Sequence, residues 1–121
     1  MGVQHQIEQM PGYLVAKFSG AGMAEDVWRQ YDSLAEHCNR TNKDKLLIDI
    51  TEAQAEISLW DRYFLGDRAQ IFACRRIKVA GVDRPERIDP QRFAEMVAQN
   101  RGVNARAFTN AEDALEWLLK G

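Results

Sequence analysis

Strand-like and helix-like patterns alternate along nearly the whole chain, and this alternation constrains the fold more than any other feature. Residues 45–50 form a short, almost unbroken apolar run, as a central strand covered on both faces would. Residues 77–82 predict a second strand of this kind. Between such runs, apolar residues recur every three or four positions, which is the spacing of a helix packed on a sheet. The pattern predicts an α/β layered fold with a largely parallel sheet.

The amino-terminal part of the chain predicts a hairpin. Residues 3–10 and 13–18 read as strands, and Pro11-Gly12 between them is a turn signal. A link this short requires antiparallel pairing. The expected order is β-β-α-β-α-β-α-β-α, a mixed, mostly parallel sheet of about five strands with four helices in a single domain over residues 1–121.

Boundary signals place the remaining elements. The sequence Ser19-Gly20-Ala21-Gly22 is expected to end the second strand and open the first helix, which runs to about Asn39–Asn42. A loop over 51–57 leads to a second helix over about 58–73, and a loop over 83–89 leads to a third. That third helix is expected to begin at Pro90 and stop at Gly102. The last strand spans 103–108, and Thr109 is predicted to cap the terminal helix.

Composition and charge exclude several functional classes. Of 121 residues 45% are hydrophobic, which is enough for one core. The net charge of −2 argues against a nucleic-acid binder that works by bulk charge. No apolar run approaches the ~20 residues that span a bilayer, and the start of the chain lacks the pattern of a signal peptide. We therefore expect a soluble, cytoplasmic protein that does not span a membrane. The basic excess over residues 62–92 is interpreted as a solvated face or as the footprint of an anion or partner.

Motifs for catalysis and cofactor binding are incomplete. A glycine pair at 20 and 22 resembles the start of a dinucleotide fingerprint, but Glu25 stands where the third glycine belongs. Asp49 has no accompanying phosphate-binding loop and is expected to bond neighbouring backbone. There is no nucleophile elbow either. The sequence predicts no enzymatic activity and no cofactor.

Potential metal ligands are too few. The chain has two cysteines, Cys38 and Cys74, and two histidines, His5 and His37, with no C-x-x-C pair. Structural zinc requires four such ligands close together. We expect no metal site and two free thiols that act as small hydrophobic side chains.

The second predicted helix is apolar over most of its circumference, which indicates cover on more than one side. Besides the sheet it would contact a neighbouring helix, a second subunit or a bound apolar ligand, and a homodimer is predicted on this basis. Its apolar residues are Leu59, Trp60, Tyr63, Phe64, Leu65, Ala69, Ile71 and Phe72.

Ser58 stands at the start of this helix, with Asp61 in the first turn. Serine is a favoured residue for capping a helix amino terminus. The same position makes Ser58 a candidate phosphorylation site, because free N–H groups and the helix dipole favour a phosphate, although Asp61 would repel it.

Several segments together resemble one family. They are the strand Leu46–Ile50 with its loop and Ser58 helix, the strand Lys78–Gly81, and the closing segment Phe108–Leu118. They resemble the SpoIIAA-like family, which is related to the STAS domains of anti-sigma-factor antagonists and, in fold, to CRAL-TRIO lipid-binding domains. The resemblance implies a STAS/SpoIIAA-like fold and a non-catalytic regulatory or binding module.

The resemblance leads to two functional hypotheses. In the first, the carboxyl edge of the strands binds a small apolar, lipid-like or acidic ligand or a protein partner, with Trp60, Tyr63 and Phe64 as an apolar wall and Arg84 and Arg87 holding an acidic group.

The second hypothesis is a phosphorylation switch. Antagonists of this family carry a phosphorylated serine just before the second helix, and Ser58 holds the matching place. Here Ile57 replaces the aspartate before that serine and Leu59-Trp60 follow it. These bulky residues favour a ligand pocket or self-association surface over the switch.

Overall fold

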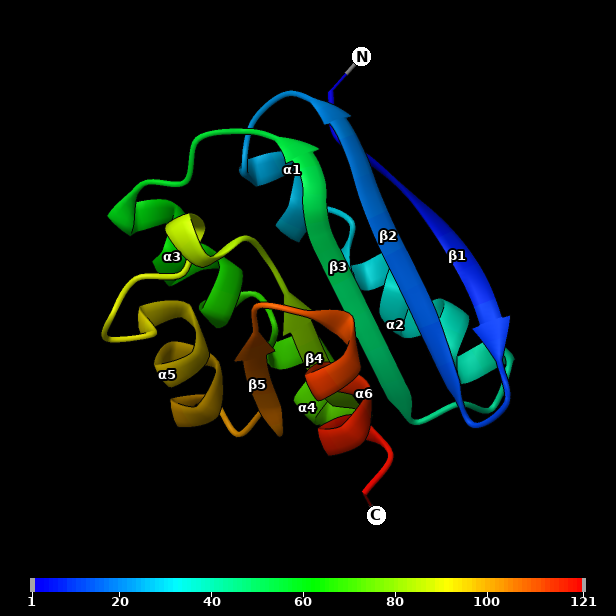
Figure 1. The fold of residues 1–121 in the computed structure, drawn as a ribbon. Coiled ribbons are helices and arrows are strands. Elements are labelled where there is room, and N and C mark those ends of the chain that lie inside the picture. Colours follow the sequence, from blue (N-terminus) through cyan, green and yellow to red (C-terminus); the bar gives the residue numbers. More distant parts are fainter. Residues whose placement is uncertain (1, 121) are drawn as a thin grey trace.

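The computed structural model describes residues 2–120, and Met1 and Gly121 lie outside the described residues. Its centre is one five-stranded sheet in which the strands lie in sequence order (Figure 1). The first strand is antiparallel to the second, and all later neighbours are parallel. The predicted α/β class and the predicted hairpin are therefore confirmed. The strands are β1 (Gln4–Met10), β2 (Tyr13–Ala21), β3 (Lys45–Gln54), β4 (Lys78–Val82) and β5 (Ala105–Phe108).

Helices cover both faces of the sheet unequally. The first five pack on one face, and the last helix alone crosses the other face in front of β3, β4 and β5 (Figure 1). Successive parallel strands lie side by side, so each crossover helix falls on the same side of the sheet. The helices are α1 (Glu25–Trp28), α2 (Tyr31–Arg40), α3 (Leu59–Asp67), α4 (Gln70–Cys74), α5 (Phe93–Asn100) and α6 (Ala111–Leu118), with a 3-10 turn η1 at Pro85–Arg87.

The main core lies between the sheet and α1 to α5. Phe18 and Leu46 are buried there because alternate strand residues point toward this face, and Phe72 packs against them from α4. A second core cluster includes Leu47 and Leu118 and lies under α6. Of the helices within residues 2–120, none combines the length and the apolar character needed to cross a bilayer.

The first predicted helix is broken in two. Gln30 lies between α1 and α2, and its side-chain amide donates to the carbonyl oxygens of Val3 (2.8 Å) and Asp26 (2.6 Å) while its oxygen contacts the ring of His5. These contacts attach the break to the start of β1. The prediction of one continuous helix was wrong because the apolar residues keep their helical spacing on both sides of the break, while the break itself depends on the polar Gln30 side chain.

The predicted ends of the second and third strands were also wrong. β2 continues past Phe18 through a register shift between Lys17 and Ser19, and Gly20 adopts a left-handed conformation (φ 98°) within it. β3 extends alongside to Gln54. The predicted loop 51–57 is thus half strand. The second predicted helix is likewise divided, into α3 and α4, with a break at Arg68 and Ala69.

Two predicted helix starts are corrected. The third helix begins at Phe93 and not at Pro90, because the Asp89 carboxylate accepts from the Phe93 N–H (3.1 Å) and Arg92 turns the chain in a left-handed conformation. The terminal helix is capped by Asn110 and not by Thr109. The Asn110 side-chain oxygen accepts from the Asp113 N–H at 2.8 Å.

The outer edge of β5 is covered by side chains of α5 and its start. Glu95 accepts the N–H of Ala107 (2.7 Å), and Arg92 donates to the carbonyl of the same residue (2.6 Å). Gln99 donates to the carbonyl of Ala105 at 3.0 Å. These side chains occupy backbone groups of β5 that could otherwise pair with a further strand.

The two cysteines lie in different environments. Cys38 is fully buried in α2, where burial raises the pKa of its thiol to about 11, whereas Cys74 is exposed at the end of α4. Both are free, as predicted, but only Cys38 acts as a core residue.

A thiol titration should separate them. In native protein near pH 8, an aromatic disulfide reagent is expected to modify Cys74 quickly and Cys38 only after unfolding, because burial blocks access and suppresses the thiolate. Cys74→Ser should abolish the fast phase. A fast phase that persists in Cys74→Ser would contradict the burial of Cys38.

Candidate functional site

The carboxyl ends of the parallel strands meet at one edge of the sheet, and the loops after β3 and β4 are joined there by Arg87. Its Nη1 donates to the carbonyl of Ala53 (2.7 Å), and its Nη2 donates to that of Ile50 (2.6 Å). Its Nε donates to the Asp83 carboxylate at 2.9 Å. Arg87 therefore joins the end of β3 to the segment that follows β4.

Asp83 is the partner that holds Arg87 in this position. The residue is buried, and burial raises the pKa of its carboxyl even though the Arg84 N–H and the Arg87 guanidinium act in the opposite direction. The shortest distance between the two charged groups is 2.8 Å. The charge of Arg87 is therefore largely used inside the protein.

Arg84, the second predicted anion-binding residue, is exposed. Its Nε donates to the carbonyl of Thr51 at 2.7 Å, so it too contacts the end of β3. Asp49, also on β3, bonds a neighbouring residue as predicted. Its carboxylate accepts from the N–H (3.0 Å) and the hydroxyl (2.7 Å) of Thr51.

The three predicted wall residues lie along α3 but face different surroundings. Trp60 is 70% exposed and meets Tyr63 edge-on, with ring centroids 6.2 Å apart. Tyr63 is half-buried and lies beside the Arg101 guanidinium. Phe64 is half-buried against Trp28, with centroids 5.3 Å apart. The second predicted helix is thus covered on its extra sides by α1 and α5, which are neighbouring helices.

Ser58 caps α3 as predicted. Its hydroxyl accepts from the Asp61 N–H (3.1 Å), and the Asp61 carboxylate accepts from the Ser58 N–H (2.8 Å), which together form a capping box. The serine itself is exposed.

Replacing this cap should cost measurable stability. Ser58→Ala is expected to lower the free energy of unfolding by about 1 kcal/mol, because the Asp61 N–H loses its partner. Ser58→Asn, which retains a capping oxygen, is the matched control and should stay close to wild type in chemical denaturation. Equal losses in both variants would contradict the capping role.

A groove borders the cap. It is lined by residues from the turn between β2 and α1, from the loop before α3 and from η1, and they include Met23, Ile57, Ser58 and Glu86. Two large apolar side chains next to Ser58, Leu59 and Trp60, are 62% and 70% exposed, and Met23 is 66% exposed. We call Met23, Ser58, Leu59 and Trp60 together the edge surface.

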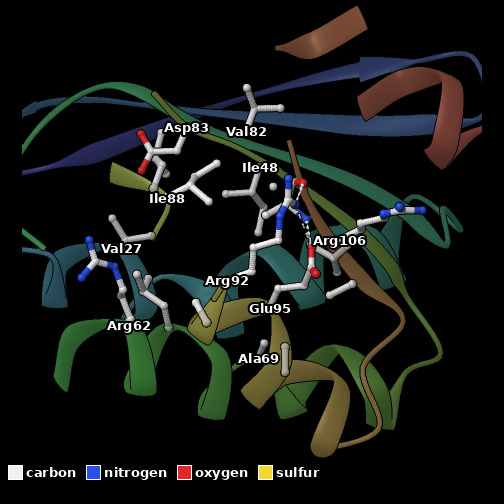
Figure 2. Close-up of a pocket in the computed structure, with 18 of the residues that line it drawn as sticks. Val27, Ile48, Arg62, Ala69, Val82, Asp83, Ile88, Arg92, Glu95 and Arg106 are labelled. Atoms are coloured by element: carbon white, nitrogen blue, oxygen red, sulfur yellow. Dashed lines mark hydrogen bonds and ion pairs between the residues drawn. The ribbon is translucent and has the colours of Figure 1, made fainter. Parts of the chain in front are cut away.

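Behind this groove lies a separate cavity of about 150 Å³ between the sheet and α3, α4 and α5. Figure 2 shows Ile48, Ala69 and Ile88 around the hollow, with Arg62 at one end near Val27. Of the five predicted binding residues only Arg87 lines it. The cavity and the groove share Ile57, Arg62 and Arg87, so they adjoin one another.

Small residues create this hollow. In one row across the sheet Ile48 lies beside Gly81, and Gly81 lies beside Ala107. A Cβ added at Gly81 would meet nothing within 4 Å. No sequence pattern above predicted this hollow, and the available signal was the small residues of β4 and β5.

Among the polar residues that line the cavity, Arg62 has a buried side-chain atom without a hydrogen-bond partner. Its side chain is 20% exposed, and its Nη2 donates to the carbonyl of Arg87 at 3.2 Å. Its buried Nε lies 3.5 Å from the Asp89 carboxylate and has no hydrogen-bond partner among the described residues.

Within residues 2–120 no three His, Cys, Asp or Glu side chains gather as a metal site requires.

Comparison with known proteins supports the fold. No protein-family model matches the chain, and no curated protein matches it either. Among solved structures, an uncharacterised protein of the DUF3478 family from Shewanella loihica, described as having a SpoIIAA-like fold, is 29% identical. The match covers 97% of this chain and 93% of that chain, with a TM-score of 0.55.

An anti-sigma factor antagonist from Mycobacterium paratuberculosis matches over 97% of this chain and 94% of its own, with a TM-score of 0.59 and 14% identity. The chain has a SpoIIAA/STAS-like fold. The resemblance predicted from the strand, the Ser58 helix and the closing segment is therefore confirmed. At this identity the antagonist shows only that the SpoIIAA-like fold is shared.

Proposed function

We propose that this SpoIIAA-like chain is a regulatory module that binds another protein through its edge surface. The observation that carries the proposal is the exposure of Met23, which lines the groove, and of Leu59 and Trp60, which directly follow the groove residue Ser58. Single exposed apolar side chains are common, but large ones that gather around a hollow mark interaction sites. One structural neighbour is described as an anti-sigma factor antagonist, a kind of protein that acts on a protein target, which supports this class.

Trp60 is the expected anchor. Its ring contacts Tyr63 edge-on and is otherwise largely in solvent, so it contributes little to the core. Exposed tryptophans that become buried on binding are frequent hot spots, and truncation costs ~2 kcal/mol or more of affinity. Ser58, two residues before Trp60, lines the groove.

The proposal is tested by comparing variants of the full chain. Proteins captured from host lysate by the wild type are identified, purified and titrated against wild type, Trp60→Ala and Met96→Ala. Met96 is exposed on α5 and is the control outside the edge surface. We expect Trp60→Ala to weaken binding about thirtyfold or more and Met96→Ala to leave it unchanged. Equal affinity of Trp60→Ala and wild type for every purified partner would overturn the proposal.

The same variants distinguish two other uses of the edge surface. If sedimentation velocity shows a dimer that dissociates in Trp60→Ala, the edge surface binds a second copy of this chain and not a different protein. A phosphate on Ser58 in protein from its host, lost in Ser58→Ala and altering partner affinity, would support the switch hypothesis. A phosphate there would lie close to the Asp61 carboxylate and would displace the cap. The predictions of a non-catalytic and cytoplasmic protein stay predictions.

A further inference from the structure

The cavity between the sheet and α3, α4 and α5 is a second feature, separate from the edge surface. Its volume of about 150 Å³ is close to that of cavities known to admit a molecule the size of benzene. It therefore has room for one compact ring.

The lining of the cavity indicates which kind of ligand would fit it. Aliphatic side chains such as Ile48, Ile50 and Leu65 form most of the lining. Gly81 and Ala107 form the floor, where side-chain bulk is missing. An apolar ligand bound here would make van der Waals contacts that the lining residues otherwise lack.

The charges around the cavity are balanced. Each of three arginines in the lining faces a carboxylate, at distances of 2.8 Å, 3.3 Å and 3.5 Å. A further lining arginine, Arg106, points away from the hollow in Figure 2. A net charge on the ligand would be left without a free counter-charge, so the lining favours a neutral molecule. The pairs are Arg87 with Asp83, Arg92 with Glu95 and Arg62 with Asp89.

One donor in this lining remains unused. The Arg62 Nε is buried and makes no hydrogen bond within residues 2–120, and the nearest oxygen of its ion-pair partner Asp89 is 3.5 Å away. A buried donor without a partner is costly, and an acceptor atom on a ligand would satisfy it once the Arg62 guanidinium turns toward the hollow.

We propose that the cavity is a binding site for a neutral, compact, largely apolar molecule with one hydrogen-bond acceptor, such as a cyclic ketone, whose oxygen meets Arg62. The body lies over Gly81 and Ala107. This differs from the acidic ligand expected from Arg84 and Arg87, because both of those side chains contact backbone carbonyls at the end of β3.

The probes are cyclohexanone and methylenecyclohexane, which have the same shape but differ in the acceptor. Each is titrated into the isotope-labelled full chain while NMR follows the methyl groups of Ile48, Ile50 and Leu65. We expect saturable shifts with both probes, and no such shifts with cyclohexanecarboxylate, which carries a charge.

Two variants locate the site. Gly81→Val fills the floor, is compatible with a β-strand, and should abolish binding of both probes while the fold is retained. Arg62→Met should weaken cyclohexanone about tenfold or more and leave methylenecyclohexane unchanged, because only the ketone accepts a hydrogen bond.

Absence of saturable shifts with cyclohexanone in the wild type would overturn the proposal, as would binding that survives in folded Gly81→Val. Equal weakening of both probes by Arg62→Met would remove the assigned role of Arg62 and with it the ligand class. None of these outcomes bears on Trp60, so the two proposals succeed or fail separately.

Discussion

Arg87→Met is expected to lower the free energy of unfolding by about 3 to 5 kcal/mol, the largest effect of any single substitution considered for this chain. The change deletes hydrogen bonds to Ala53, Ile50 and Asp83 and leaves the Asp83 carboxylate buried without its counter-charge. Urea denaturation followed by tryptophan fluorescence measures the loss.

The loss should depend on pH. Burial raises the pKa of Asp83 above its ordinary 3.8, so the folded state holds this proton at a higher pH than the unfolded chain does. Its contribution to stability therefore falls as the pH rises from 3.8 through the folded-state pKa. Removing Arg87, which acts to lower that pKa, raises it further. The destabilisation by Arg87→Met should thus be smaller near pH 4 than near pH 7.

Arg84→Met is the control for this pair. Arg84 is exposed and its side chain makes one hydrogen bond, to Thr51, so its replacement should cost about 1 kcal/mol or less. Similar losses in the two variants, or a loss for Arg87→Met that is the same at both pH values, would show that Arg87 does not compensate Asp83.

Gly66→Ala is expected to lower the free energy of unfolding by about 1 to 3 kcal/mol, although alanine favours helices more than glycine does. Gly66 lies in α3 where this helix crosses α5. A Cβ there would approach the carbonyl oxygen of Ala94 to 2.4 Å and the Cβ of Val97 to 2.8 Å. Because one of these atoms is backbone, α5 as a whole must shift.

The matched control is Gly81→Ala. The same methyl group meets open space at this strand position, so we expect a gain of about 0.5 to 1 kcal/mol from the restricted unfolded chain. Thermal and chemical unfolding of both variants test the contrast. Destabilisation of similar size in the two would mean that the close contact of α3 with α5 is not the cause.

The order of elements could be predicted from the sequence because it depends on patterns within single segments. The apolar run ending at Ile50 and the hairpin turn at Pro11-Gly12 each identify an element without reference to the rest of the chain. Ser58 was recognised as a cap for the same reason, since its partner Asp61 is only three residues away.

Features that depend on distant partners could not be predicted. The break at Gln30 follows from contacts with Val3, 27 residues earlier. Arg87 looked like a free cation because, apart from Asp83, its partners are backbone carbonyls more than thirty residues earlier on β3. The cavity depends on Gly81 and Ala107 lying side by side, which only the strand register reveals.

The covered edge of β5 determines how this sheet can be extended. With the outward groups of Ala107 and the carbonyl of Ala105 bonded to α5, a further strand can be added only beside β1. Two copies joined in this way would use their β1 strands about a two-fold axis and would present no second open edge. Such growth ends at a pair, so the molecule is protected against polymerising into fibrils through its sheet.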